Sequence, residues 1–209
     1  MKRSIIAAAF AIAVLPASAQ AVPIFVDNFN TENGGVGALN YGSFANFSIS
    51  SGTVDLIGNG LFDFLPGNGL YVDLDGSTGN AGLTTANPIA LGPGSYILSF
   101  ALAGNQRGGS ESVDVNIFGG LNASYAFVNL VRAASDPFST VSVAFSVLAS
   151  DSVQFNFANT GGDNVGALLD NIELTGDVAP VPEPGTLLLL GGGLALAART
   201  IRRRQTARS

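Results

Sequence analysis

The chain has 209 residues, of which 47% are hydrophobic and 27 are glycine, and its formal net charge is −6. It contains no histidine, cysteine or tryptophan, which excludes Ser-His and Cys-His nucleophilic sites, disulfides and the usual His/Cys zinc sites. Residues 22–181 hold only two arginines, Arg107 and Arg132, against 14 acids, a net charge of −12 that argues against nucleic acid as a partner.

The N-terminal segment has the pattern of a secretory signal peptide. Lys2 and Arg3 precede an apolar run over residues 5–15, which is too short for a stable membrane span. Small residues at positions 17–21 then supply a small-x-small cleavage site. We therefore expect residues 1–21 to form a signal-peptide helix that is removed on export.

The middle of the chain alternates apolar and polar residues in short runs separated by Gly, Asn and Asp. The clearest runs cover residues 96–103, 113–117, 141–147 and 153–157. Further strands are expected at residues 24–29, 46–50, 53–57, 61–65, 70–75, 123–131 and 167–175. No part of this region has a helical period. The pattern predicts an all-β domain over residues 22–178, an antiparallel jelly-roll sandwich of about ten strands.

Two stretches of this domain resemble a known family. Residues 70–105 contain an Asp-Leu-Asp-Gly loop, a Pro-Gly turn and a closing Ala-Gly-Asn after an aromatic-aliphatic strand. Residues 161–175 contain Leu-Asp-Asn-Ile in what would be the last strand. Together they resemble the galactose-binding-like jelly rolls of exported bacterial proteins and of some plant cell-wall proteins. The resemblance implies the fold, but this fold hosts sugar binders, adhesion modules and structural units alike.

Asp170 interrupts an apolar alternation. The period places it on the inward face with Ile172 and Leu174, where a carboxylate must be paired, hydrogen-bonded or bound to metal. In the resembled domains an aspartate at this place often helps to hold a structural calcium, with oxygens from the first strand region. The resemblance implies further ligands among three residues: Asp27, Asn28 and Glu32. The alternative is that Asp170 only caps loop backbone N–H groups.

Two loops are further candidates for a site. Asp73-Leu74-Asp75-Gly76 has a fragment of a calcium loop, but it lacks the third ligand before the glycine and the glutamate at position 12, so a turn is expected. Arg107 lies in the polar loop 105–109 and is the candidate ligand-binding residue; the alternative is a solvated charge. Carbohydrate sites usually stack an aromatic ring on the sugar, and without tryptophan we expect weak or no glycan binding.

The C-terminal segment, residues 179–209, has three parts. Pro182-Glu183-Pro184 precedes an apolar helix predicted over residues 185–198, and five arginines follow it. At about 1.5 Å per residue this short transmembrane helix only marginally crosses a bilayer core of about 30 Å. The positive-inside rule puts the arginines in the cytoplasm.

The three-part tail resembles the PEP-CTERM sorting signal of exported bacterial proteins, which a membrane protease called exosortase is thought to recognise and cut. The resemblance assigns the sorting motif to six residues: Pro182, Glu183, Pro184, Arg202, Arg203 and Arg204. The alternative is an ordinary anchor that is never cut. Before processing, the ectodomain would face the periplasm, and afterwards it would reach the cell surface or the extracellular matrix.

These features favour an exported structural or adhesive protein of the cell surface or biofilm matrix, with exosortase as its processing partner. One alternative is a carbohydrate-binding module for extracellular polysaccharide. A second is a glycoside hydrolase that uses two carboxylates, the one familiar chemistry that the composition permits. No particular pair of carboxylates stands out in the sequence, so a non-enzymatic role is expected, with calcium as the one expected metal.

Overall fold

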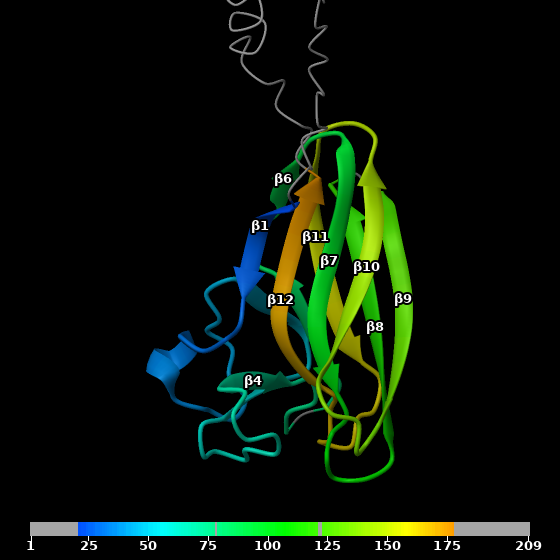
Figure 1. The fold of residues 1–209 in the computed structure, drawn as a ribbon. Helices are drawn as coiled ribbons and strands as arrows, with labels where there is room; N and C mark the ends of the chain where they lie inside the picture. Colours follow the sequence, from blue (N-terminus) through cyan, green and yellow to red (C-terminus); the bar gives the residue numbers. More distant parts are fainter. Residues whose placement is uncertain (1–20, 78, 121–122, 178–209) are drawn as a thin grey trace, which may run out of the picture. The chain divides into compact units, whose positions relative to one another are not determined.

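Twelve strands and one short 3-10 turn make up the part of the chain that the computed structural model describes, residues 21–77, 79–120 and 123–177 (Figure 1). The elements in chain order are β1 (Ala21–Asp27), η1 (Glu32–Gly35), β2 (Phe47–Ser51), β3 (Asp55–Gly58), β4 (Leu70–Asp73), β5 (Gly82–Thr85), β6 (Ile89–Leu91), β7 (Gly94–Ala103), β8 (Ser110–Gly119), β9 (Ser124–Ala133), β10 (Ser139–Val147), β11 (Asp151–Asn159) and β12 (Leu168–Asp177).

The strands form two sheets of six strands each. One has the order β10-β7-β12-β4-β3, with β1 paired to β12, and the other has the order β2-β5-β11-β8-β9, with β6 paired to β11. All of these pairings are antiparallel. This arrangement confirms the predicted antiparallel sandwich. The physical reason for it is that strands with one apolar face bury that face against a second sheet.

Aromatic side chains fill the space between the sheets. Phe155 and Phe157 of β11 are both fully buried. The ring of Phe155 lies edge-on to Phe25 at 5.3 Å and to Phe47 at 6.1 Å, and the ring of Phe157 lies edge-on to Phe100 at 5.0 Å. Such contacts add to the burial of apolar area, which has to stabilise a domain that has no disulfide.

One predicted strand is wrong and two were missed. Residues 61–65 form a loop, in which Phe62 has a φ of 44°, a left-handed conformation that no regular strand contains. Four of the five residues, all but Asp63, are large and apolar, and this composition suits a strand although the backbone here does not form one. The short strands β5 and β6 were missed because three or four residues give too few alternations to detect.

The predicted alternation along β12 is broken by a bulge. The pairing of β12 with β7 shifts between Asp170 and Glu173, and Asn171 has a φ of 48°. Leu169, rather than Asp170, therefore joins Ile172 and Leu174 in the main core. The predicted burial of Asp170 is confirmed, since it is only 1% exposed, but its predicted place on the face of Ile172 and Leu174 is wrong.

The two ends of the described chain lie together. Ala21 of β1 is paired with Asp177 of β12, whereas Leu168, at the start of β12, is paired with Ala103 at the far end of β7 (Figure 1). Ten residues of strand separate these two levels, about 30 Å. The loops that follow β4, β7 and β11 are therefore at the end of the sandwich opposite to the one where residues 20 and 178 are attached.

Several sequence predictions concern residues outside the described part. These are the signal-peptide helix, except for Ala21, which opens β1, the helix over residues 185–198 and the six residues of the sorting motif. Among the described residues, none belongs to a helix with the length and apolar character needed to cross a membrane.

Candidate functional site

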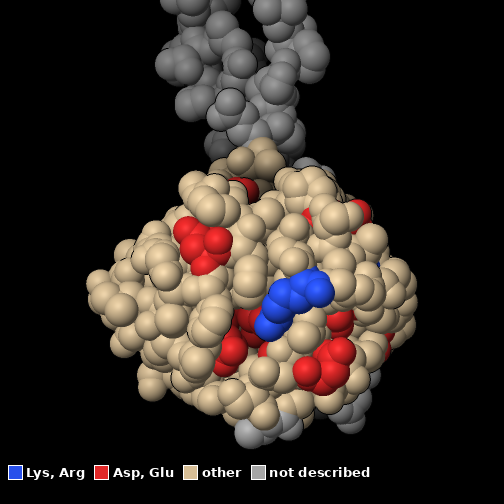
Figure 2. All heavy atoms as spheres, turned by 90° about the horizontal axis from the view of Figure 1, so that it is seen from below, with Lys and Arg blue, Asp and Glu red and all other residues tan. Residues whose placement is uncertain are grey.

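A pocket of about 160 Å³ opens between the loops at the end of the sandwich opposite the termini. We call it the loop-end pocket. It is lined by residues from six segments: Leu39, Asp55, Ile57, Phe62, Phe64, Asp73, Ser77, Arg107 and Asn164. Figure 2 shows this end of the molecule, where a basic side chain lies among several acidic ones.

Arg107 is held in the pocket by the loop that follows β7. Asn105, fully buried, accepts hydrogen bonds from the backbone N–H groups of Arg107 and Gly108 at 2.7 and 3.0 Å. Its amide donates to Glu111 Oε1 at 2.7 Å, which ties the loop to β8. Gly104 is required before it, because a Cβ there would lie 1.8 Å from the carbonyl oxygen of Ala133.

The guanidinium of Arg107 links three other segments. Nη2 forms an ion pair with Asp73 Oδ2, and Nη1 donates to the carbonyl oxygen of Asn164 at 3.1 Å. The guanidinium carbon also lies 5.1 Å from the centre of the Phe64 ring, within the range of a cation–π contact. Arg107 is therefore fixed in place, and its predicted alternative as a solvated charge does not describe it.

Asp55 and Asp73 face each other across the β3–β4 pair. Asp73 is 2% exposed, and its Oδ1 accepts from the backbone N–H groups of Asp75 and Gly166. Asp55 Oδ1 accepts from the N–H of Asn40 at 2.7 Å. Within the described residues, no hydrogen bond or ion pair reaches Asp55 Oδ2.

Burial dominates the ionisation of Asp73. Loss of solvent raises the pKa of its carboxyl to about 7; the Arg107 guanidinium lowers that pKa and the nearby Asp55 charge raises it. One guanidinium therefore does not fully compensate the negative charge that the two carboxylates bring to this end of the domain.

Two phenylalanines form the apolar wall of the pocket. The rings of Phe62 and Phe64 are stacked, 6.4 Å apart with an angle of 29° between them, and Phe62 is 56% exposed. The buried Tyr71 holds this loop: its hydroxyl donates to Asp63 Oδ1 at 3.2 Å and accepts from the N–H of Leu65 at 3.0 Å. The pocket thus combines an exposed aromatic face with charged groups fixed at its rim.

The residues proposed for calcium are only partly brought together. Burial is the main cause that raises the pKa of Asp170 to about 7; the backbone hydrogen bond from Asn171 opposes this rise, and the nearby charge of Asp27 adds to it. Both Asp170 oxygens accept hydrogen bonds from Asn171, one from its backbone N–H and one from its side-chain amide. Asn28 is exposed and accepts from the N–H of Asn30.

Glu32, the other residue implied for calcium, accepts hydrogen bonds from residues 41 and 45 instead. Its Oε1 accepts from the N–H of Ala45 at 2.9 Å, and its Oε2 accepts from the hydroxyl of Tyr41. In the described part of the chain, no three or more acidic residues are grouped so that they could hold a metal ion. Any metal at Asp27 and Asp170 would therefore need backbone or amide oxygens for the rest of its ligands.

The Asp73-Leu74-Asp75-Gly76 segment is a buried turn. Asp75 is fully buried, and its Oδ2 accepts from the N–H groups of Gly162 and Asp163. The turn ties the loop after β4 to the loop after β11. Its Oδ1 has no hydrogen-bond partner.

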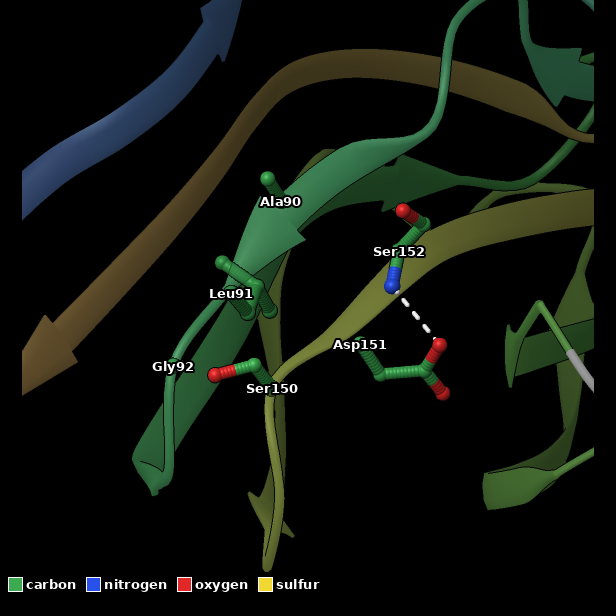
Figure 3. Close-up of a pocket in the computed structure, with 6 residues that line it drawn as sticks. All are labelled: Ala90, Leu91, Gly92, Ser150, Asp151 and Ser152. Atoms are coloured by element: carbon green, nitrogen blue, oxygen red, sulfur yellow. Dashed lines mark hydrogen bonds between the residues drawn. The ribbon is translucent and has the colours of Figure 1, made fainter.

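A second hollow, of about 450 Å³, lies between the end of β6 and the turn before β11 (Figure 3). Its one charged group, Asp151, is already bonded: Oδ1 accepts from the N–H groups of Ser152 and Gly120, and Oδ2 accepts from the Tyr125 hydroxyl at 2.6 Å. The other lining residues are Ala90, Leu91, Gly92 and Ser150. It offers no aromatic face and is the weaker candidate.

The sequence analysis named Arg107, which lines the loop-end pocket, but it did not single out Asp55, Phe62 or Phe64. The assignment of residues 61–65 to a strand hid the two phenylalanines. A signal was nevertheless present, because the stretch 58–69 contains four glycines, a proline and two asparagines, a composition typical of a loop. Large aromatic residues within such a loop point to a binding surface.

The C-terminal segment was compared with known protein families. Residues 180–204 match the family described as the PEP-CTERM protein-sorting motif. The chain carries a PEP-CTERM sorting signal. The signal marks it as an exported protein with a C-terminal membrane-anchoring segment, as the sequence predicted. No curated protein matches the chain.

Solved structures resemble the domain that precedes this sorting motif. The CBM22-1 xylan-binding domain of Xyn10C from Paenibacillus barcinonensis is 11% identical, with a TM-score of 0.53, over 78% of this chain and 99% of that one. The CBM22-1–CBM22-2 tandem of the same protein is 12% identical, with a TM-score of 0.53, over 82% of this chain and 50% of the tandem. At such identities the likeness shows the fold alone, and it confirms a jelly roll.

Proposed function

We propose that this exported protein is a structural or adhesive component of the cell surface or biofilm matrix, and that its jelly roll binds extracellular polysaccharide through the loop-end pocket. The observation that carries the proposal is the meeting of an exposed aromatic pair with Arg107, Asp55 and Asp73 in one pocket. A xylan-binding domain of the same fold supports it. The carbohydrate-binding alternative thus becomes the means by which a matrix protein attaches.

The chemistry of the pocket suits a sugar ring. The exposed face of Phe62 offers an apolar platform for the C–H face of a pyranose. Asp55 accepts hydrogen bonds from hydroxyl groups, and Arg107 donates to ring or hydroxyl oxygens. A few convergent polar groups beside an aromatic wall are typical of small-ligand sites. A volume of about 160 Å³ suits one sugar unit of a longer chain that continues into solvent.

The same pocket argues against glycoside hydrolysis. Two carboxylates do face each other there, but Asp73 has both oxygens occupied, one by Arg107 and the other by two backbone N–H groups. Both Asp73 oxygens are thus engaged by protein groups, whereas a hydrolase needs two carboxyl groups that reach the substrate. We expect no release of reducing sugar from any polysaccharide that the protein binds.

Removal of the aromatic platform tests the proposal. The variant Phe62→Ala should bind a retained polysaccharide about tenfold more weakly, a loss of about 1.4 kcal/mol, because it removes the stacking face and leaves the polar groups. Affinity electrophoresis on gels containing xylan, β-glucan, galactan, chitin or chitosan measures this. The matched control is Phe127→Ala, which removes an equally exposed phenylalanine from β9. Retention by none of the five polymers would remove the proposal.

The place at which the C-terminal segment leaves the domain supports this role. The sorting segment continues from Asp177, about 30 Å along β12 from the level of the pocket, so an anchored protein can present the pocket away from its attachment point. We expect exosortase to cut the chain near Pro182. Mass spectrometry of the protein recovered from cells and from the matrix checks this. An intact C-terminus in both fractions would instead make the tail a permanent anchor.

We also propose a structural calcium ion at Asp27 and Asp170, with backbone oxygens completing its shell. Two buried carboxylates near one another, without a cationic side chain, support this. Calcium at a hundred times its Kd should stabilise the fold by about 2.7 kcal/mol and raise the melting temperature by several degrees. Asp170→Asn should abolish that shift. No heat and no shift at millimolar calcium in a calorimetric titration would remove the proposal.

A further inference from the structure

The loop-end pocket carries more negative charge than its one cation compensates. Asp55 and Asp73 bring two carboxylates, and Arg107 pairs with Asp73 alone. Arg132, the other arginine of the ectodomain, is used elsewhere, where its Nε donates to the carbonyl oxygen of Leu102. No lysine occurs in residues 21–177. An anionic ligand is therefore disfavoured at this site.

Asp55 has one carboxylate oxygen to which no protein donor in the described part of the chain is bonded. It is 9% exposed, it lines the pocket, and its Oδ2 is reached by no hydrogen bond or ion pair within the described residues. A mostly buried carboxylate gains more from a cationic hydrogen-bond donor than an exposed one does. The aromatic wall next to it is already adapted to a cation, since the Arg107 guanidinium lies over Phe64.

We propose that the loop-end pocket recognises an amino sugar, a hexosamine unit with a free ammonium group in an extracellular polysaccharide. The ammonium group would bind Asp55 Oδ2, and the pyranose ring would lie against Phe62. This inference rests on the proposed polysaccharide-binding function and names the chemical class of its ligand. A lysine side chain would satisfy the charge but would leave the ring-sized aromatic face unused.

Three ligands of equal length and linkage test this, because they differ only at carbon 2: a glucosamine oligomer, its N-acetylated counterpart and a cello-oligosaccharide. They are titrated calorimetrically into the full chain in a mild detergent. We expect the glucosamine oligomer to bind with one-to-one stoichiometry and at least tenfold more tightly than the other two. Its advantage should shrink as sodium chloride is raised, because screening weakens an ionic contact.

Two variants separate a built site from a general attraction to an acidic surface. Asp55→Asn keeps the acceptor for Asn40 and should reduce the amino-sugar advantage to less than threefold, with a change of less than threefold for the neutral oligomers. Asp114→Asn removes one charge from β8, outside the pocket, and should preserve the advantage. Thermal unfolding of each variant verifies that it is folded.

The outcomes distinguish this inference from the function on which it rests. Equal affinity for the three oligomers would overturn the amino-sugar assignment and leave polysaccharide binding intact. Persistence of the advantage in Asp55→Asn, or equally tight binding of poly-lysine, would overturn it as well. Binding of none of the three oligomers and of none of the polymers in the gel assay would remove both.

Discussion

The free energy of unfolding of the ectodomain should fall as the pH rises from about 4 to about 7. Burial raises the pKa of Asp73 from 3.8 to about 7 in the folded state, so the folded protein holds a proton that the unfolded chain releases. A group with a raised folded pKa contributes its stability below the unfolded pKa and loses it as the pH passes the folded pKa. Three pKa units correspond to roughly 4 kcal/mol at most.

The variant Asp73→Asn isolates this contribution. Urea unfolding at several pH values, with chelator present, should show a shallower dependence for the variant than for the wild type. Asp170, which has a similarly raised pKa, contributes in both proteins, so the difference between them reports Asp73 alone. Identical slopes would mean that the ion pair with Arg107 keeps Asp73 ionised throughout, and that burial is not the dominant effect.

The variant Phe155→Ala should destabilise the ectodomain by about 3–5 kcal/mol. Phe155 is fully buried and its ring contacts those of Phe25, Phe47 and Phe157 between the sheets. Truncation removes buried apolar area and leaves a cavity that a close-packed sandwich cannot collapse. Domains of this size have only about 5–15 kcal/mol of stability in total, and no disulfide compensates here.

Denaturant unfolding measures this loss, with Phe127→Ala as the control. Phe127 is 60% exposed on β9, so its truncation should change the free energy of unfolding by less than about 0.5 kcal/mol. A small effect at Phe155 would show that the aromatic cluster repacks, contrary to the rigid core inferred from its edge-to-face contacts.

The fold separates the loop-end pocket from the point at which the C-terminal segment is attached to the domain. The sorting segment leaves the domain where Ala21 meets Asp177, and the loop-end pocket lies at the other end. The second hollow, at Asp151, also differs in chemistry, because its only carboxylate is already satisfied by internal donors.

The sequence by itself predicted the N-terminal signal peptide, the C-terminal sorting motif and the fold class, of which the sorting motif and the fold class are confirmed. All three depend on local order: a basic, apolar and small-residue run at one end, the Pro-Glu-Pro, apolar and arginine run at the other, and period-two alternation between them. In a strand such as β7 or β8, the alternation of residues along the strand itself indicates which side chains face the core. Composition alone likewise excluded histidine, thiol and lysine chemistry in the mature domain.

Only the tertiary structure decided the site. Arg107 and Asp73 are 34 residues apart in the chain, and Asp55 and the phenylalanine loop belong to the same β3–β4 hairpin as Asp73, which Arg107 reaches from the loop after β7. The loop after β3 and the bulge in β12 depend on left-handed residues, Phe62 and Asn171 respectively, whose backbone angles no periodic pattern reports. Alternation is a property of residues that are adjacent along one strand. A pocket forms where loops from different parts of the chain meet. The positions of these loops are set only when the two sheets pack against each other.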